Sequence, residues 1–172
     1  MEPIRFYSPA DEHGFLSNFS RHGFTTLGNR YATSEHFFQS MKFRGTKHEK
    51  EVRIASSPGE SAKLGRDRSK PLRKDWENVK DDVMRHAVLS KFWENEDIGK
   101  KLLDTDDIIL IEHTNRDSYW GDGGNGSGRN MLGRVLMEVR NILKAEYKFR
   151  LDCHYSVPGP ISQYLDSLKN FK

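Results

Sequence analysis

The chain has 172 residues, of which 35% are hydrophobic and 31% are charged, and its formal net charge is +3. This length fits one domain with a core of its own, and no segment approaches the roughly 20 consecutive apolar residues that cross a bilayer. Cys153 is the only cysteine, which excludes an intrachain disulfide and a thiolate-rich metal site. We therefore expect a cytoplasmic protein with nuclear access left open, no metal and no membrane partner.

The first half of the chain predicts short strands and then helices. In chain order we expect a strand at Ile4–Tyr7, a hairpin at Phe24–Tyr31, and helices at about 34–43, Glu49–Ala55 and Gly59–Leu64. The hairpin should turn at Gly28-Asn29, a pair suited to positive φ. Thr33 or Ser34 should cap the helix that follows it.

The second half predicts longer helices around one strand. We expect a helix capped by Asp75 and running to about Trp93, a helix at Ile98–Leu103, a strand at Asp107–Ile111, and a final helix with an apolar stripe formed by Leu132, Val135, Leu136, Val139, Ile142 and Leu143. The fold class is α+β, a predominantly helical single domain with a few short strands. The domain should span residues 1–150, followed by a tail at 151–172 with a weakly amphipathic stretch at Ile161–Phe171.

Glu35, Gln39 and Lys42 share one narrow stripe of the helix predicted after Thr33, because successive residues turn by about 100°. An adjoining apolar stripe should face the core (Phe37, Phe38, Met41). The carboxylate and the amine therefore lie two turns apart, with Cα atoms roughly 10 Å apart. That spacing suits two groups that flank a ligand. An ordinary solvent-facing stripe is the alternative, and spacing alone favours it.

Five glycines fall within the eight residues after Trp120. Backbone N–H groups in such a segment can close on an anion, and the segment leads into the start of the last helix. Gly121, Gly123 and Gly126 match a dinucleotide-binding fingerprint, but Trp120 and Asp122 crowd the turn and no convincing second strand follows. The pattern predicts an aromatic ring and a carboxylate beside an anion-binding loop. A flexible linker is the alternative, weakened by the apolar area of Trp120.

Basic residues concentrate between Lys42 and Lys80, where twelve Lys and Arg accompany six Asp and Glu. Such a segment attracts the phosphates of a nucleotide or a nucleic acid, or is only a solvated face. Arg66 and Arg68 carry guanidinium groups suited to phosphate. Trp76 either stacks on a base or belongs to the core, and the residues leave both readings open.

Several of these segments, taken in order from about residue 4 to residue 145, resemble the YbiA-like NADAR family. The matching motifs are Phe6-Tyr7-Ser8, Leu16-Ser17-Asn18-Phe19, Thr33 to Gln39, Gly65-Arg66, Pro71 to Trp76, Glu112-His113-Thr114, Tyr119 to Gly124, and Asn130-Met131-Leu132-Gly133. The resemblance implies a mostly helical N-glycosidase without a cofactor. The bond it cuts joins ribose to an exocyclic amine.

The resemblance also implies the substrate and the site. We expect removal of ADP-ribose from the guanine amino group of DNA or RNA; the alternatives are hydrolysis of early riboflavin-pathway intermediates, which are 5-phosphoribosylamino-pyrimidines, or a non-catalytic ADP-ribose-binding module. Glu35, Lys42 and Asp122 are the expected catalytic residues. The expected substrate-binding residues are Asn18, Arg66, Arg68, Trp76, Trp120, Gly121, Gly123, Gly124 and Gly126.

Two mechanisms fit these residues. In the first, Lys42 attacks C1 of a ring-opened ribose as a Schiff-base nucleophile, while Glu35 or Asp122 protonates the leaving amine and later activates water. In the second, carboxylates alone flank an oxocarbenium-like centre. The phosphates should bind Arg66, Arg68 and the backbone N–H groups of 123–126, with the helix of Glu35 and Lys42 meeting this loop in one pocket.

Overall fold

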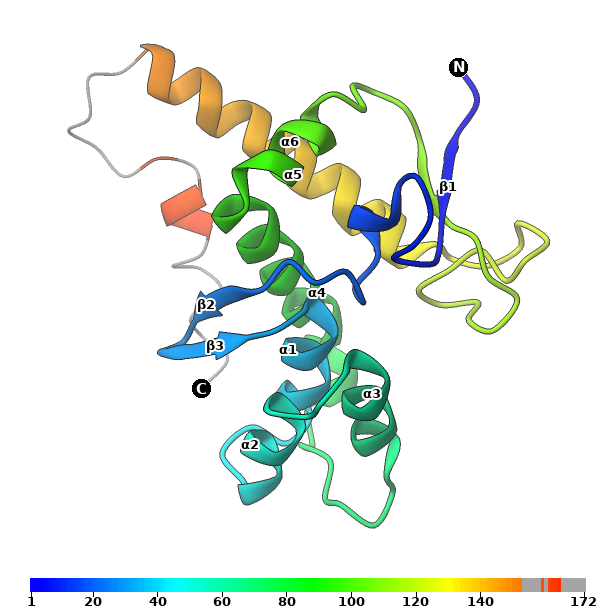
Figure 1. Ribbon diagram of the computed structural model, residues 1–172, viewed down its shortest axis with the longest axis vertical. Helices are drawn as coiled ribbons and strands as arrows, with labels where there is room; N and C mark the ends of the chain where they lie inside the picture. The colour runs from blue at the N-terminus through cyan, green and yellow to red at the C-terminus, as the bar shows by residue number, and fades with distance from the viewer. Residues whose placement is uncertain (153–158, 160, 165–172) are drawn as a thin grey trace. The chain divides into compact units, whose positions relative to one another are not determined.

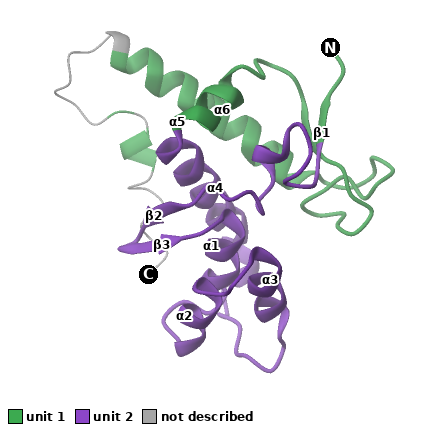
Figure 2. Cartoon of the chain, viewed as in Figure 1, with its two compact units in different colours: residues 1–5, 96–172 green, residues 6–95 purple. Residues whose placement is uncertain are grey.

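The computed structural model describes residues 1–152, 159 and 161–164 (Figure 1). It divides into two compact units, one of residues 6–95 and one of residues 1–5 and 96–172 (Figure 2). We call them the 6–95 unit and the 96–172 unit. Every strand in the described residues is three residues long, and helices account for most of the regular structure. The predicted α+β, predominantly helical class is confirmed.

The 6–95 unit opens with a short 3-10 turn, η1 (Gly14–Leu16), and the predicted hairpin. Strands β2 (Phe24–Thr26) and β3 (Asn29–Tyr31) pair antiparallel in full register. Leu27 and Gly28 make the turn, with φ of 50° and 74°, the left-handed conformation that tight hairpins require. The prediction of a turn at Gly28-Asn29 is wrong by one residue, because Asn29 already belongs to the strand.

The helices after the hairpin are α1 (Ser34–Met41), α2 (Lys47–Arg53), α3 (Pro58–Arg66) and α4 (Trp76–Glu94). The hydroxyls of Thr33, Thr46 and Ser57 begin the first three by accepting N–H groups of the first turn. Asp75 precedes α4, but Arg73 binds its carboxylate at 2.6 and 2.8 Å, and it makes no side-chain cap. Asp75 is the N-cap residue of α4 as predicted, but its side chain makes no capping hydrogen bond.

Helix α1 lies at the centre of the 6–95 unit, in contact with α2, α3, α4 and β3 (Figure 1). Phe24, Tyr31 and Phe37 pack their rings together at centroid distances between 4.9 and 5.9 Å, and all three are fully buried. This aromatic cluster fixes α1 against the hairpin. The side chains of α1 thus have protein on every side, which positions the polar groups among them.

The 96–172 unit contains α5 (Glu96–Leu103), β4 (Leu110–Glu112) and α6 (Met131–Asp152), and β4 pairs with β1 (Ile4–Phe6). The strand predicted at Asp107–Ile111 begins only at Leu110. Residues 104–107 form a turn in which Asp106 has a φ of 49°, and Arg140 donates to the carbonyl of Ile108 at 2.9 Å.

The apolar stripe of α6 is confirmed, since its members are buried apart from the partly exposed Ile142 (Leu132, Val135, Leu136, Val139 and Leu143). Residues 161–164 are helical, and the rest of the predicted stretch at Ile161–Phe171 lies outside the described residues. The division of the chain at residue 150 stays a prediction. None of the helices in the described part is long and apolar enough to span a membrane.

Candidate active site

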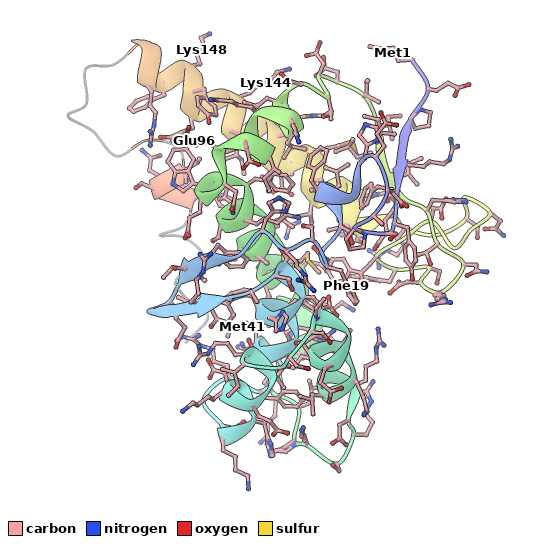
Figure 3. The ribbon with its side chains drawn as sticks, viewed as in Figure 1. Met1, Phe19, Met41, Glu96, Lys144 and Lys148 are labelled. Atoms are coloured by element: carbon pink, nitrogen blue, oxygen red, sulfur yellow. The ribbon has the colours of Figure 1, made fainter. Side chains whose placement is uncertain are left out.

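Helix α1, which ends at Met41 (labelled in Figure 3), buries a carboxylate and an amide side by side. Gln39 donates a hydrogen bond of 2.8 Å from Nε2 to Oε1 of Glu35. The two residues are only 6% and 4% exposed. The alternative of an ordinary solvent-facing stripe is therefore excluded, and the predicted core stripe of Phe37, Phe38 and Met41 is buried as expected.

Lys42 follows directly on α1, and its amine lies between aromatic rings and a backbone carbonyl. Nζ donates to the carbonyl oxygen of Gly65 at 3.3 Å and lies 5.7 and 5.6 Å from the ring centroids of Phe38 and Trp76. Burial lowers the pKa of Lys42 to about 8; the Glu35 carboxylate opposes this shift, and the nearby Arg68 and Arg66 add to it. At neutral pH roughly a tenth of these amines are uncharged.

Gly65 brings α3 close enough to α1 to complete this environment. A Cβ at this position would lie 2.0 Å from Oε1 and 2.8 Å from Cδ of Gln39. Only a residue without a side chain leaves room for the amide that binds Glu35. The same close approach presents the Gly65 carbonyl to Lys42.

Four of the predicted binding residues lie in the 6–95 unit. Trp76 is 5% exposed, and its ring meets that of Phe38 edge to face at a centroid distance of 5.0 Å. The structure therefore supports a core position for Trp76. Arg66 and Arg68 are exposed. Asn18 accepts the N–H of Glu35 at its backbone oxygen, while its buried side-chain Oδ1 has no hydrogen-bond partner among the described residues.

Asp122 belongs to the 96–172 unit, where it organises the glycine loop. Its carboxylate accepts from Nδ1 of His113 at 2.8 Å, from the N–H of Gly124 at 2.9 Å and from the N–H of Thr114 at 3.2 Å. Burial pushes the pKa of Asp122 up, but these bonds outweigh it, and the pKa lies below the ordinary value. The carboxylate is ionised at neutral pH, so the expectation that Asp122 supplies a proton is not supported.

The start of α6 is not the open anion site that the sequence suggested. The N–H groups of Asn130, Met131 and Leu132 donate to carbonyls of the loop between 119 and 121 at 3.0 Å each. These bonds use the donors that a ligand would need. The start of α6 is therefore closed to an anion, and the assignment of the phosphate to Arg66, Arg68 and the N–H groups of 123–126 stays a prediction.

Some of the backbone N–H groups that were predicted to bind phosphate already donate to acceptors within the protein. The N–H of Gly123 donates to the Asp117 carbonyl, and that of Gly124 donates to Asp122. Gly124 and Gly126 have φ of 79° and 82°, which only glycine adopts without strain. Gly121 is buried against Thr114, where a Cβ would lie 2.6 Å from a methyl group.

Trp120 is held at the base of this loop. Its N–H donates to Oδ1 of Asp117 at 2.8 Å, and its ring meets Tyr119 edge to face at 5.1 Å. The residue is partly exposed, so part of its side chain is accessible to a ligand.

His113 is the polar residue that sequence reasoning did not select. It lies with Arg5 and Asp122 in the wall of a cavity of about 370 Å³ within the 96–172 unit. Its sequence signals were its place in the Glu112-His113-Thr114 motif and its position directly before a polar and glycine-rich segment. The predicted site residues thus fall in both units, each of which holds a polar cluster of its own, and the prediction of one shared pocket stays a prediction.

The comparisons with known proteins agree with the mainly helical α+β fold. The N-glycosidase YbiA of Shigella flexneri serotype 5b is 50% identical over 143 residues, which span 83% of this chain and 89% of that protein. A riboflavin biosynthesis protein of Vibrio vulnificus is 38% identical over 168 residues, which span 98% of this chain and 43% of that protein. The NMR structure of YbiA from E. coli matches with a TM-score of 0.80 at 45% identity, covering 91% of this chain and 92% of that one.

The family follows from the extent of these matches. The model of the NADAR domain matches residues 5–144, most of the chain and nearly all of the region that carries the motifs. This chain belongs to the NADAR family.

Proposed function

We propose that this chain is an N-glycosidase that hydrolyses the bond between ribose C1 and an exocyclic amino group of a base. The observation that carries the proposal is the Lys42 amine, whose pKa is lowered to about 8 beside a buried carboxylate. A lysine with an ordinary pKa is almost wholly protonated at neutral pH and is a poor nucleophile. Relatives named as N-glycosidases support the same class of reaction.

In the proposed mechanism the ribose ring opens, leaving an imine between C1 and the amine of the base. The uncharged Lys42 adds to C1. The Glu35 carboxylate carries the two hydrogens of the attacking amine to the base nitrogen as protons, and the C1–N bond to the base breaks. Water then adds to the resulting Schiff base, its oxygen becomes the aldehyde oxygen of ribose, and its two hydrogens pass, through Glu35, to the Lys42 nitrogen, which leaves as an amine.

Borohydride reduction tests the covalent step. We expect a ribose adduct on Lys42 when substrate and borohydride are present together, no adduct in Lys42→Met, and an undiminished adduct in Lys50→Met, which changes an exposed lysine of α2. Catalytic turnover without any trapped adduct would eliminate the Schiff base. It would leave the rival in which carboxylates flank an oxocarbenium-like centre.

We propose ADP-ribose on the guanine amino group of nucleic acid as the substrate. The exposed Arg66 and Arg68 support it, because both lie near enough to Lys42 to lower its pKa and both suit phosphate. Early riboflavin intermediates are the second candidate, supported by the name of the Vibrio vulnificus relative. Release of ADP-ribose from a modified guanine oligonucleotide, measured beside turnover of the phosphoribosylamino-pyrimidine, separates the two. Affinity for the oligonucleotide should fall steeply with salt.

A non-catalytic ADP-ribose-binding module is distinguished by Glu35→Ala. An enzyme should keep ADP-ribose binding in this variant and lose turnover by about a hundredfold or more. Equal and negligible turnover by wild type and variant on both substrates would support the module.

A further inference from the structure

The cavity of the 96–172 unit brings an arginine and a histidine together at the glycine loop. Arg5 reaches it from β1 and His113 from the residue after β4, and the loop between 122 and 128 forms the rest of its wall with Ile111 and Asn130. Its volume of about 370 Å³ is in the range of small-ligand sites. None of the ion pairs among the described residues involves Arg5, so its guanidinium charge is available to a ligand.

Asp122 fixes which nitrogen of His113 faces the ligand. An ionised carboxylate only accepts hydrogen bonds, so Nδ1 of His113 carries the hydrogen that it donates to Oδ2 of Asp122. Nε2 is then the ring atom left for other partners, on a side chain that is 48% exposed. In the neutral ring that carries this Nδ1–H, Nε2 accepts a hydrogen bond, and in a ring that carries both hydrogens Nε2–H donates one.

The negative charge of Asp122 does not dominate this cavity. Backbone N–H groups of Thr114 and Gly124 already bind its Oδ1, and the residue is 6% exposed. The N–H groups of Asn125 and Gly126, in the same loop, donate to no acceptor among the described residues. Arg5 and these backbone donors therefore line the cavity beside His113, a set typical of a phosphate site.

We propose that this cavity binds the phosphate of a phosphorylated ribose, a phosphomonoester or a diphosphate, through Arg5 and the backbone N–H groups of Asn125 and Gly126, with His113 beside them. Asp122 is the positioning residue that orients the His113 ring through its bond to Nδ1. This inference rests on the proposed function for the identity of the ligand, which is a ribose that carries phosphate.

Binding of product fragments tests the site directly. Calorimetry of the full chain should detect ribose 5-phosphate or ADP-ribose, and ribose alone should bind at least tenfold more weakly than the better of the two. Arg5→Met and His113→Gln should each weaken the phosphorylated ligand by about tenfold or more. Arg116→Met removes an exposed cation of the same loop that does not line the cavity, and it should change the affinity less than twofold. Amide spectra establish that each variant is folded.

The two phosphorylated probes identify the source of the phosphate. Tighter binding of ribose 5-phosphate indicates a monoester, and tighter binding of ADP-ribose indicates a diphosphate.

Nitrogen-15 spectra of the imidazole add a readout for Asp122: Nδ1–H should predominate in the wild type, and the tautomers should mix in Asp122→Asn. Unchanged tautomer populations would overturn the positioning role.

The experiments distinguish a wrong phosphate site from a wrong proposed function. If folded Arg5→Met and His113→Gln bind both probes as the wild type does, the phosphate site is overturned whatever the enzyme hydrolyses. If these variants lose binding while the wild type turns over no N-ribosyl substrate, the site stands and the proposed function falls.

Discussion

Replacing Lys42 with methionine should abolish turnover and at the same time stabilise the protein. Methionine keeps most of the length and apolar surface of the side chain and removes only the amine. The pKa of Lys42 is about 8 instead of 10.5 because burial penalises its charged form. Lys42 therefore lowers the free energy of unfolding at every pH at which its amine is protonated in the unfolded chain.

The size of the effect follows from that pKa. A difference of 2.5 between 10.5 and 8 corresponds to about 3 kcal/mol at ~1.36 kcal/mol per pKa unit. The methionine variant also loses the hydrogen bond from Nζ to the carbonyl of Gly65, worth about 1 kcal/mol. We expect the free energy of unfolding at pH 7 to rise by about 2 kcal/mol.

The pH dependence has a definite sign. Between pH 8 and 10.5 the unfolded chain binds more protons at Lys42 than the folded chain, so the stability of the wild type rises with pH across this window. The variant lacks this contribution, and its advantage should shrink by roughly 2 kcal/mol between pH 7 and pH 10.

Urea unfolding of the wild type, Lys42→Met and Lys50→Met at pH 7 and pH 10 measures these terms. Lys50 is exposed, and its substitution should change stability by less than about 0.5 kcal/mol at either pH. A methionine variant at position 42 that is less stable than the wild type at pH 7, or whose advantage does not change with pH, would refute the reasoning.

Three further substitutions test other parts of the structure. Lys91→Met should raise the melting temperature at neutral pH by several degrees, because burial lowers the pKa of Lys91 to about 7; a fall would contradict this. Gly65→Ala should cost about 1–3 kcal/mol and reduce kcat, because the new Cβ displaces Gln39; unchanged kcat would separate that amide from catalysis. Asp122→Asn should cost about 1–3 kcal/mol and speed hydrogen exchange at Gly124. The wild type should lose the Asp122 contribution as the pH falls through its lowered pKa, and equal acid sensitivity of the two proteins would refute that role.

Much of the fold could be predicted because its signals are local. Thr33, Thr46 and Ser57 begin helices through hydroxyl caps, and the stripe of α6 has the helical period. The errors arose where a residue other than glycine takes a positive φ, which the sequence does not indicate. Leu27 does so in the hairpin turn, and Asp106 does so in the turn that shortens β4 to begin at Leu110.

The candidate site, like the fold, could be predicted where its signals are local and not where distant residues meet. The stripe of Glu35 and Gln39 follows from helical spacing alone. The contact of Gly65 with Gln39 joins two helices and has no local signal beyond the glycine itself. The bond between His113 and Asp122 spans nine residues across a turn, and a histidine before a loop is an ordinary feature until that turn is known.

The polar groups of α1 explain why an acid and an amine can share a buried region without cancelling one another. The carboxylate of Glu35 raises the pKa of Lys42, but burial exceeds this effect, and Arg68 and Arg66 reinforce burial. Gln39 donates to Glu35 from a neutral amide. This hydrogen bond satisfies the carboxylate but does not bring the positive charge that the partner in an ion pair would. The amine therefore remains partly uncharged at neutral pH while the acid remains close. A buried ion pair tight enough to stabilise both charges would have removed the nucleophile that the proposed reaction requires.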